Sequence, residues 1–254
     1  MSTNVHLIRA ASLAYDSLLA LVYPQACAVC GRSVESRILG VACAACWRQT
    51  QIFTGQETVC WKCGLLSPGR VAEDQREQVR CRRCNTDAFS AARACGVYEG
   101  ALRAAVLSLK GEPYICRRVI ELLSETQRRY PLSEATLIIP VPLHAKREKS
   151  RGYNQAALLA RALSAANSLP FDEASLVRTQ HSDRHRAGLD AKDRRETVAN
   201  SFQVALPKLV ANERVLLIDD VFTTGATAAS CAETLRLAGA AEVFVLTVAR
   251  PMNY

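Results

Sequence analysis

The sequence lacks several features that would place it in a special class of protein. Aromatic residues make up only 6% of its 254 residues, and glycine (12) and proline (9) are not enriched. There is no low-complexity tract and no internal repeat apart from a doubled cysteine pattern. These absences exclude fibrous and low-complexity chains. The composition is typical of a soluble globular protein long enough for one ordinary domain and a small second one.

A long uncharged apolar run is also missing near the N-terminus. Arg9 and Asp16 interrupt the first 23 residues, and no small-residue cleavage site follows, which argues against a membrane span or a signal peptide. Apolar positions fall on one helical stripe that ends before Pro24. We therefore expect residues 1–23 to form an amphipathic helix that packs on the protein, and we expect the chain to be cytoplasmic.

Positive charge exceeds negative charge. The formal net charge is +8, from 32 Lys and Arg against 24 Asp and Glu. A basic balance favours anionic partners such as phosphates or nucleic acid, although it also serves solubility alone. Arginine dominates the positive count and suits bidentate phosphate contacts.

Cysteine is plentiful, and eight of the 11 cysteines stand in Cys-x-x-Cys pairs. Twelve residues separate the first pair from the second, and seventeen separate the third from the fourth. This spacing is typical of zinc ribbons, in which two such pairs close a tetrahedron of thiolates. The pairs are Cys27 and Cys30, Cys43 and Cys46, Cys60 and Cys63, and Cys81 and Cys84.

Two glycines favour one way of combining the pairs. Gly31 and Gly64 follow the first and third pairs and permit the tight turn that ends a knuckle. We therefore predict one or two structural zinc ions, with pairs one and two sharing a site and pairs three and four sharing another. Interleaved pairing, disulfides and redox-active thiols remain alternatives. The remaining Cys95, Cys116 and Cys231 are predicted to be small core residues.

After residue 90, apolar strands alternate with helical patterns, which predicts a mostly parallel α/β sheet with helices on both faces. We expect three parts: the helix at 1–23, a double zinc-ribbon region at 24–90, and the α/β domain at 91–254. Residues 169–200 are polar and show little periodicity. The expected strands lie within 92–100, 136–143, 201–206, 214–220 and 242–250, and the expected helices within 100–110, 111–130, 154–167 and 224–240.

Two carboxylates, Asp219 and Asp220, directly follow the apolar strand at 215–218. The turn Thr223, Thr224, Gly225, Ala226 and Thr227 then leads into a helix. Ligands of such sheets bind at the carboxyl ends of the strands, and a turn at a helix N-terminus holds phosphate. A ribose 5-phosphate satisfies both features, with its hydroxyls donating to the carboxylates and its phosphate in the turn. An acidic helix cap is the simpler alternative.

A basic segment, HAKREKSRGYNQ at 144–155, lies between a predicted strand and a predicted helix. It carries His144, Lys146, Arg147, Lys149 and Arg151. Gly152 permits a tight turn, and Asn154 is a helix-capping residue. The loop suits a pyrophosphate or a nucleic-acid backbone, with a solvated basic loop as the alternative.

The stretch VLLIDDVFTTGAT (215–227) resembles the phosphoribosyl pyrophosphate (PRPP) signature of type I phosphoribosyltransferases. Nearly the whole chain resembles the ComF competence family, which joins a double zinc ribbon to a phosphoribosyltransferase-like domain. The resemblance also rests on LSLKGEP (107–113) and on the segment from Ile139 to Leu163. It implies catalytic roles for Asp219, Asp220 and Arg151. It places PRPP at residues 223–227 and at Lys110, Gly152, Asn154 and Gln155.

The resemblance weakens between residues 178 and 197. Arg178 and Arg194 match the family pattern, but His185 and Thr197 stand where family members tend to carry Gln and Asn. Phosphoribosyltransferases often close a loop over the substrate in this region. Because of these departures, the resemblance assigns no specific catalytic role to residues of this loop.

The resemblance implies a PRPP-binding protein that uses magnesium with PRPP and handles incoming single-stranded DNA during natural competence. An active phosphoribosyltransferase acting on a nitrogenous base is one alternative, and a PRPP sensor that binds competence proteins through its ribbons is another. Arginines of the ribbons, such as Arg82 and Arg83, would contact a nucleic-acid backbone. The sparse aromatic candidates for base stacking are Trp47, Trp61, Tyr98, Tyr114 and Tyr153.

Overall fold

The computed structural model describes residues 25–179 and 201–252. The predicted helix at 1–23 and most of the 178–197 loop lie outside these ranges. Within the described residues, no helix is both long and apolar enough to cross a membrane.

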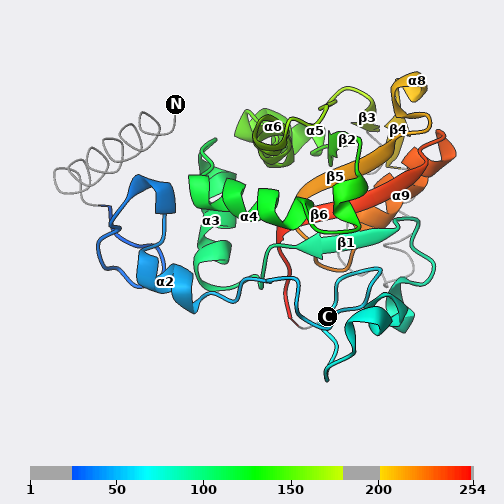
Figure 1. Ribbon diagram of the computed structural model, residues 1–254. Helices are drawn as coiled ribbons and strands as arrows, with labels where there is room; N and C mark the ends of the chain where they lie inside the picture. Colours follow the sequence, from blue (N-terminus) through cyan, green and yellow to red (C-terminus); the bar gives the residue numbers. More distant parts are fainter. Residues whose placement is uncertain (1–24, 180–200, 253–254) are drawn as a thin grey trace, which may run out of the picture.

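The larger part of the chain is built on a four-stranded parallel sheet in the order β1-β6-β5-β2 (Figure 1). The two central strands, β5 and β6, share the longest ladder, from Arg214 opposite Glu242 to Val221 opposite Ala249. A separate antiparallel pair joins β3 to β4. The strands are β1 (Ala91–Ala94), β2 (Leu137–Pro140), β3 (Leu176–Arg178), β4 (Phe202–Val204), β5 (Arg214–Val221) and β6 (Glu242–Ala249).

Helices cover both faces of the sheet, as the sequence predicts. Three helices, α3 (Gly100–Gly111), α4 (Arg117–Gln127) and α6 (Gln155–Asn167), contact one face, and α9 (Ala226–Leu237) contacts the other. Side chains alternate along each strand, so β5 sends Leu216 and Ile218 into the first core and Val215 and Leu217 into the second. The predicted fold class is confirmed.

Several local expectations need correction. The helix expected over 111–130 begins at Arg117 and ends at Gln127, because Cys116 is extended and precedes its first turn. The basic segment expected as a loop contains the short helix α5 (Ala145–Arg151). The region of little periodicity contains β3, whose three residues are too few to show alternation. A further short helix, α8 (Pro207–Val210), follows β4.

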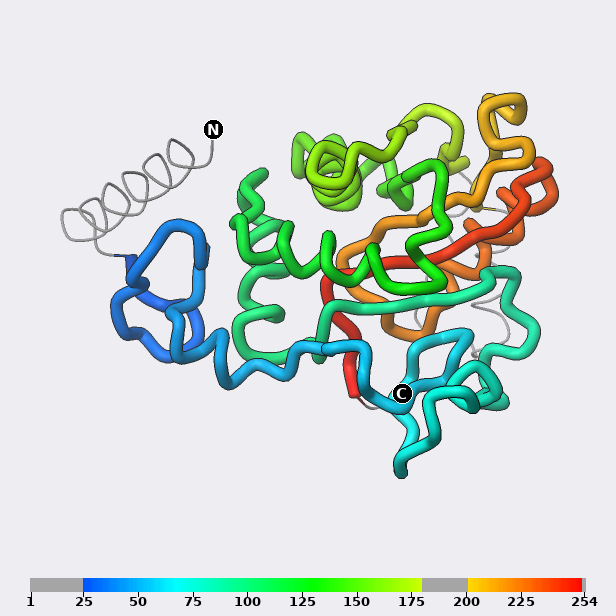
Figure 2. The backbone as a smooth tube through the Cα atoms, in the orientation of Figure 1, coloured from blue at the N-terminus to red at the C-terminus, as the bar shows by residue number. Residues whose placement is uncertain are grey.

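The two cysteine ribbons lie at different places on this domain (Figure 2). The first contains η1 (Arg37–Leu39) and α2 (Ala44–Gln49), and it packs against α3 and α4. The second contains η2 (Glu73–Gln78) and η3 (Arg82–Cys84), and it lies beside β1. Its Cys60, Cys63 and Cys84 share a buried cluster with Ala92 of β1. A further short turn, η4 (Leu132–Glu134), precedes β2.

The segment between the ribbons crosses very close to Gly96, just after β1. Ile52 forms a β-bridge with Gly96. A Cβ at Gly96 would lie 2.3 Å from the carbonyl oxygen of Gln51 and 2.6 Å from Leu102 Cδ1. Glycine at this position therefore permits the ribbon linker to dock on the sheet.

We expect Gly96→Ala to destabilise the protein by about 1–3 kcal/mol, because the added methyl group meets a backbone oxygen that cannot move freely. Thermal unfolding checks this prediction. Gly111→Ala is the matched control, since a Cβ at that helix terminus meets nothing within 4 Å. Equal melting temperatures for Gly96→Ala and wild type would contradict the account.

Candidate functional site

The eight paired cysteines form two separate tetrads. The sulfur atoms of Cys27, Cys30, Cys43 and Cys46 all lie within 4.8 Å of one another, and so do those of Cys60, Cys63, Cys81 and Cys84. This is the sequential pairing that the glycines favoured. Gly31 and Gly64 adopt positive φ angles of 75° and 69°, as the expected turns require.

The sulfur spacing fits tetrahedral zinc. The Sγ atoms of Cys27 and Cys46 are 3.8 Å apart, and those of Cys60 and Cys84 are 3.6 Å apart. Four sulfurs at the usual zinc–sulfur distance would lie about 3.8 Å from one another. These separations are too long for disulfides. The two tetrads therefore fit two structural zinc sites, each with no open coordination position.

A buried arginine links the second tetrad to the sheet. Arg250 is 7% exposed and donates a hydrogen bond from Nη1 to the Cys63 carbonyl oxygen. Its guanidinium also lies 5.4 Å from the centre of the Phe222 ring. A Cβ at Gly225 would meet the same ring at 2.7 Å. Contacts thus run without interruption from the second ribbon to the predicted phosphate turn.

The acidic doublet lies inside strand β5 near its carboxyl end, because the strand continues to Val221 instead of ending at residue 218 as expected. Its two side chains point to opposite faces because residues alternate along a strand. Asp220 faces the α3 side, where its Oδ2 lies 2.9 Å from the Lys110 ammonium. Asp219 faces the α9 side, and its Oδ1 accepts a hydrogen bond of 2.8 Å from the Asp220 amide. Lys110, predicted to reach an anion, therefore lies directly at the acidic pair.

Burial and a neighbouring charge raise the pKa of Asp219, the first carboxyl of the doublet. The pKa of Asp219 is raised from 3.8 to about 7, first because burial disfavours its charged form and second because of the Asp220 carboxylate. Lys110 opposes this shift without cancelling it. A carboxyl with such a perturbed pKa at the edge of a sheet is a candidate binding group.

The threonine turn shares a small hollow with Asp219. The hollow has a volume of about 30 Å³, and its lining includes Asp219, Thr223, Gly225, Thr227 and Thr247. Gly225 has a φ of 80° and precedes the first residue of α9. Among the described residues, the amides of Thr224, Gly225 and Thr227 have no hydrogen-bond acceptor, and the Ala226 amide has only a long contact of 3.4 Å to Thr224 Oγ1. Such amides at a helix N-terminus suit a phosphate.

The basic segment lies at the same edge of the sheet. Val141 donates its amide hydrogen to the Ile218 carbonyl of β5, and Asn154 donates from Nδ2 to the Val141 carbonyl. Asn154 also caps α6 by accepting a hydrogen bond from the Ala156 amide, as predicted. Gly152, with a φ of 80°, ends α5. The Tyr153 hydroxyl donates to the Leu109 carbonyl, next to Lys110.

Some of the predicted site residues therefore lie together, and others do not. Lys110 joins Asp220, and Asp219 shares a hollow with the turn. The Nη1 of Arg151 donates instead to Gln155 Oε1 at 2.5 Å, and within the described ranges no contact joins Arg151 to either carboxylate. Sequence reasoning missed Thr247, which lies opposite Asp219 in the β5–β6 ladder and lines the hollow. The sequence could have indicated Thr247, because it is the only polar residue in the interior of an otherwise apolar strand.

The acidic edge also fits magnesium in its donor chemistry. Mg²⁺ binds carboxylates together with substrate phosphates more often than it binds a cage made only by protein. Asp219 and Asp220 offer carboxylate oxygens, and Thr223 and Thr224 offer exposed hydroxyls. The ion pair with Lys110 occupies one of these oxygens, so a cation would compete with an ammonium group there.

Comparison with known proteins identifies relatives of the chain. The double zinc ribbon domain family matches residues 18–85. Competence protein F of Haemophilus influenzae is 39% identical over 140 residues, covering 54% of this chain and 59% of that protein. The DNA utilization protein YhgH of Shigella flexneri is 28% identical over 240 residues, covering 91% of this chain and all of that protein.

Several solved structures resemble part of the chain. Adenine phosphoribosyltransferase of Leishmania tarentolae has 17% identity and a TM-score of 0.36, over 57% of this chain and 74% of that chain. The PRPP amidotransferase of B. subtilis has 19% identity and a TM-score of 0.35, over 52% of this chain and 27% of that chain. Likeness at this level carries no argument about function.

The parallel sheet with helices on both faces and the two cysteine tetrads define the class of the protein: an α/β protein that carries a double zinc ribbon domain. Competence protein F and YhgH are similar to this chain over 54% and 91% of its length, respectively.

We expect two zinc ions per chain, and Cys81→Ser should lower this number to one, because a ribbon with three thiolates loses most of its affinity. Elemental analysis of the purified protein measures the ratio. Cys231→Ala serves as the control and should retain both ions, since that buried thiol belongs to neither tetrad. Full zinc content in Cys81→Ser would contradict the second site.

We expect Asp219→Asn to raise the melting temperature by several degrees at pH 8. Between pH 3.8 and about 7, native Asp219 holds a proton that the unfolded chain has lost, so wild-type stability falls as the pH rises through this window. The advantage of the variant should grow from pH 4 to pH 7 and then level off. Glu233→Gln, an exposed carboxylate on α9, is the control. A constant difference at all pH values would contradict the raised pKa.

Proposed function

We propose that the chain binds PRPP or a related ribose phosphate at the carboxyl end of its sheet. The observation that carries this proposal is the hollow shared by Asp219 and the threonine turn, whose amides lack acceptors among the described residues. A sugar phosphate has the matching groups, with an anion for the amides and hydroxyl donors for the carboxylate.

Each predicted residue has a role in this proposal. The phosphate accepts hydrogen bonds from the turn formed by residues 223–227. The ribose hydroxyls donate to Asp219 and Asp220. Lys110 is 34% exposed at its side chain, so its ammonium has room to turn from Asp220 toward a pyrophosphate. Arg151, held by Gln155, contributes a second cation from the α5–α6 segment, and Gly152 and Asn154 fix the course of that segment.

Magnesium belongs to the same proposal, with Asp219 and Asp220 as the groups that would hold it. When bound, it would supply positive charge that offsets the phosphates and the two carboxylates. Without the cation, the two carboxylates would repel the anionic ligand.

A second proposed role is the handling of single-stranded DNA by a cytoplasmic protein. The names of two relatives, competence protein F and DNA utilization protein YhgH, support it. So do the exposed basic residues of η3 and α5, including Arg82, Arg83 and Arg147, which would contact phosphates. In this role, residues 24–90 form a double ribbon module next to the α/β domain of residues 91–254.

Transferase turnover is the alternative activity at the same site. The enzyme would hold PRPP in place while a nitrogen nucleophile displaces pyrophosphate from the anomeric carbon, and Asp219 and Asp220 would stabilise positive charge on the ribose. Release of pyrophosphate in the presence of a panel of nucleobases separates a transferase from a protein that only senses PRPP.

We expect the double variant Asp219→Asn, Asp220→Asn to lose PRPP affinity by about a hundredfold or more, because two charge-assisted hydrogen bonds to the ribose are removed. Calorimetry with PRPP and magnesium measures the affinity, and circular dichroism checks that the sheet is intact. Glu233→Gln is the matched control for the loss of a carboxylate. Unchanged affinity in the double variant would remove the acidic doublet from the site.

A further inference from the structure

A large cavity lies away from the proposed ribose phosphate site, between the second ribbon and the end of α4. Its volume is about 510 Å³, which is in the usual range for small-molecule sites. Edge strand β1 contributes Arg93, and the segment after α4 contributes Arg129 and Tyr130. The strand order puts two strands, β1 and β6, on this side of the acidic doublet of β5.

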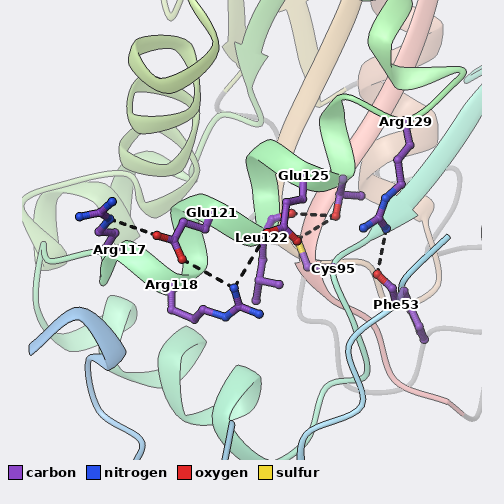
Figure 3. A network of polar contacts seen from close by, with 9 residues as sticks. Phe53, Cys95, Arg117, Arg118, Glu121, Leu122, Glu125 and Arg129 are labelled. Atoms are coloured by element: carbon purple, nitrogen blue, oxygen red, sulfur yellow. Dashed lines mark hydrogen bonds and ion pairs between the residues drawn. The ribbon is translucent and has the colours of Figure 1, made fainter. Parts of the chain in front are cut away.

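Three arginines reach this cavity without a carboxylate partner. Arg76, Arg93 and Arg129 line it, and within the described ranges none of them forms an ion pair. Arg129 donates from Nη1 to the Phe53 carbonyl at 2.8 Å (Figure 3). By contrast, two arginines in the first turn of α4 pair with Glu121, and one of these also pairs with Glu125.

Two of the arginine nitrogens are buried and unsatisfied. Nη2 of Arg93 and Nε of Arg76 have no hydrogen-bond partner. Arg93 uses its other terminal nitrogen, Nη1, to donate to the carbonyls of Trp61 and Ala92. Buried donors without an acceptor are uncommon and costly. Both arginines line the cavity, so an anion bound there would lie next to guanidinium groups that are not fully hydrogen-bonded.

Two aromatic rings stand beside these cations. Trp61 and Tyr130 lie with ring centres 5.9 Å apart and planes tilted by 40°. The Arg93 guanidinium lies 4.9 Å from the centre of the Trp61 ring. Tyr130 is 60% exposed, so its ring offers an open face to a planar ligand. Rings next to arginine are the usual platform for unpaired nucleobases.

The acidic residues at the cavity do not pair with its arginines. Glu57 lines it, but its carboxylate accepts hydrogen bonds from the amides of Thr54 and Gly55 and from the Thr54 hydroxyl. Glu73 and Glu77 also line the cavity, as exposed residues of η2, and neither forms an ion pair with the lining arginines within the described ranges. The side chains there with an unsatisfied polar atom are therefore arginines.

We propose that this cavity binds a nucleotide, with the base against Tyr130 and Trp61 and the phosphate against Arg129 and Arg93. A free nucleotide and a unit of a single strand share this chemistry. The proposal concerns a different site from that of the ribose phosphate and does not depend on PRPP binding.

Fluorescence anisotropy of a labelled short oligothymidylate, with unlabelled dTMP and inorganic phosphate as competitors, tests the proposal on the full zinc-loaded chain. Arg129→Gln should weaken oligonucleotide binding about tenfold and lower the salt dependence by about one phosphate contact. Tyr130→Leu should weaken it by a similar factor without changing the salt dependence, because stacking carries no charge. Arg128→Gln is the matched control, since this exposed neighbour hydrogen-bonds Asn167 instead. It should bind within twofold of wild type.

The outcomes separate the sources of the ligand. Competition by dTMP at the affinity of the oligonucleotide supports a site for free nucleotides, and much weaker competition supports a single strand. Equal losses in Arg129→Gln and Arg128→Gln, full binding by Arg129→Gln, or competition by phosphate as strong as by dTMP would overturn the proposal. PRPP affinity should stay unchanged in all three variants, so failure here is distinct from failure of the ribose phosphate site. Zinc content and melting temperature confirm that each variant is folded.

Discussion

Two adjacent carboxylates at the end of a strand buried on both faces are the constraint on which the rest of the site depends. The alternation of β5 separates them, so that Asp220 meets Lys110 from α3 while Asp219 turns toward α9. One charge is thereby neutralised. The other carboxyl is left with a pKa raised to about 7. Such an arrangement costs stability in the free protein, which is common where a site is prepared for a ligand.

The ribbons add a second constraint, because segments this short bury too little apolar surface to fold alone. Four thiolates around a metal replace the missing core, and each ribbon then docks on a different part of the α/β domain. The second ribbon reaches the phosphate turn through Arg250 and Phe222. It also forms one wall of the arginine-lined cavity. The second cysteine tetrad, the threonine turn and the cavity are thus joined by one set of contacts.

Much of this arrangement could be predicted from the sequence, where the pattern was local. The Cys-x-x-Cys spacing and the two glycines predicted both tetrads, and long apolar strands predicted the order of β5, α9 and β6. Asn154 was correctly predicted as a cap. Contacts between distant segments were harder to predict. No local pattern indicates that Arg151 bonds Gln155, or that Arg129 and Trp61, far apart in the chain, meet at one cavity. Strand β3 was missed because three residues carry too little periodicity.

The central claim is that a sugar phosphate docks between Asp219 and the threonine turn. A crystal structure of the chain with ribose 5-phosphate tests it most directly. The account predicts the phosphate on the amides of residues 224–227 and a ribose hydroxyl within hydrogen-bond distance of Asp219. A phosphate bound elsewhere, or turn amides bonded to the protein's own groups while the sugar stays in solvent, would contradict it.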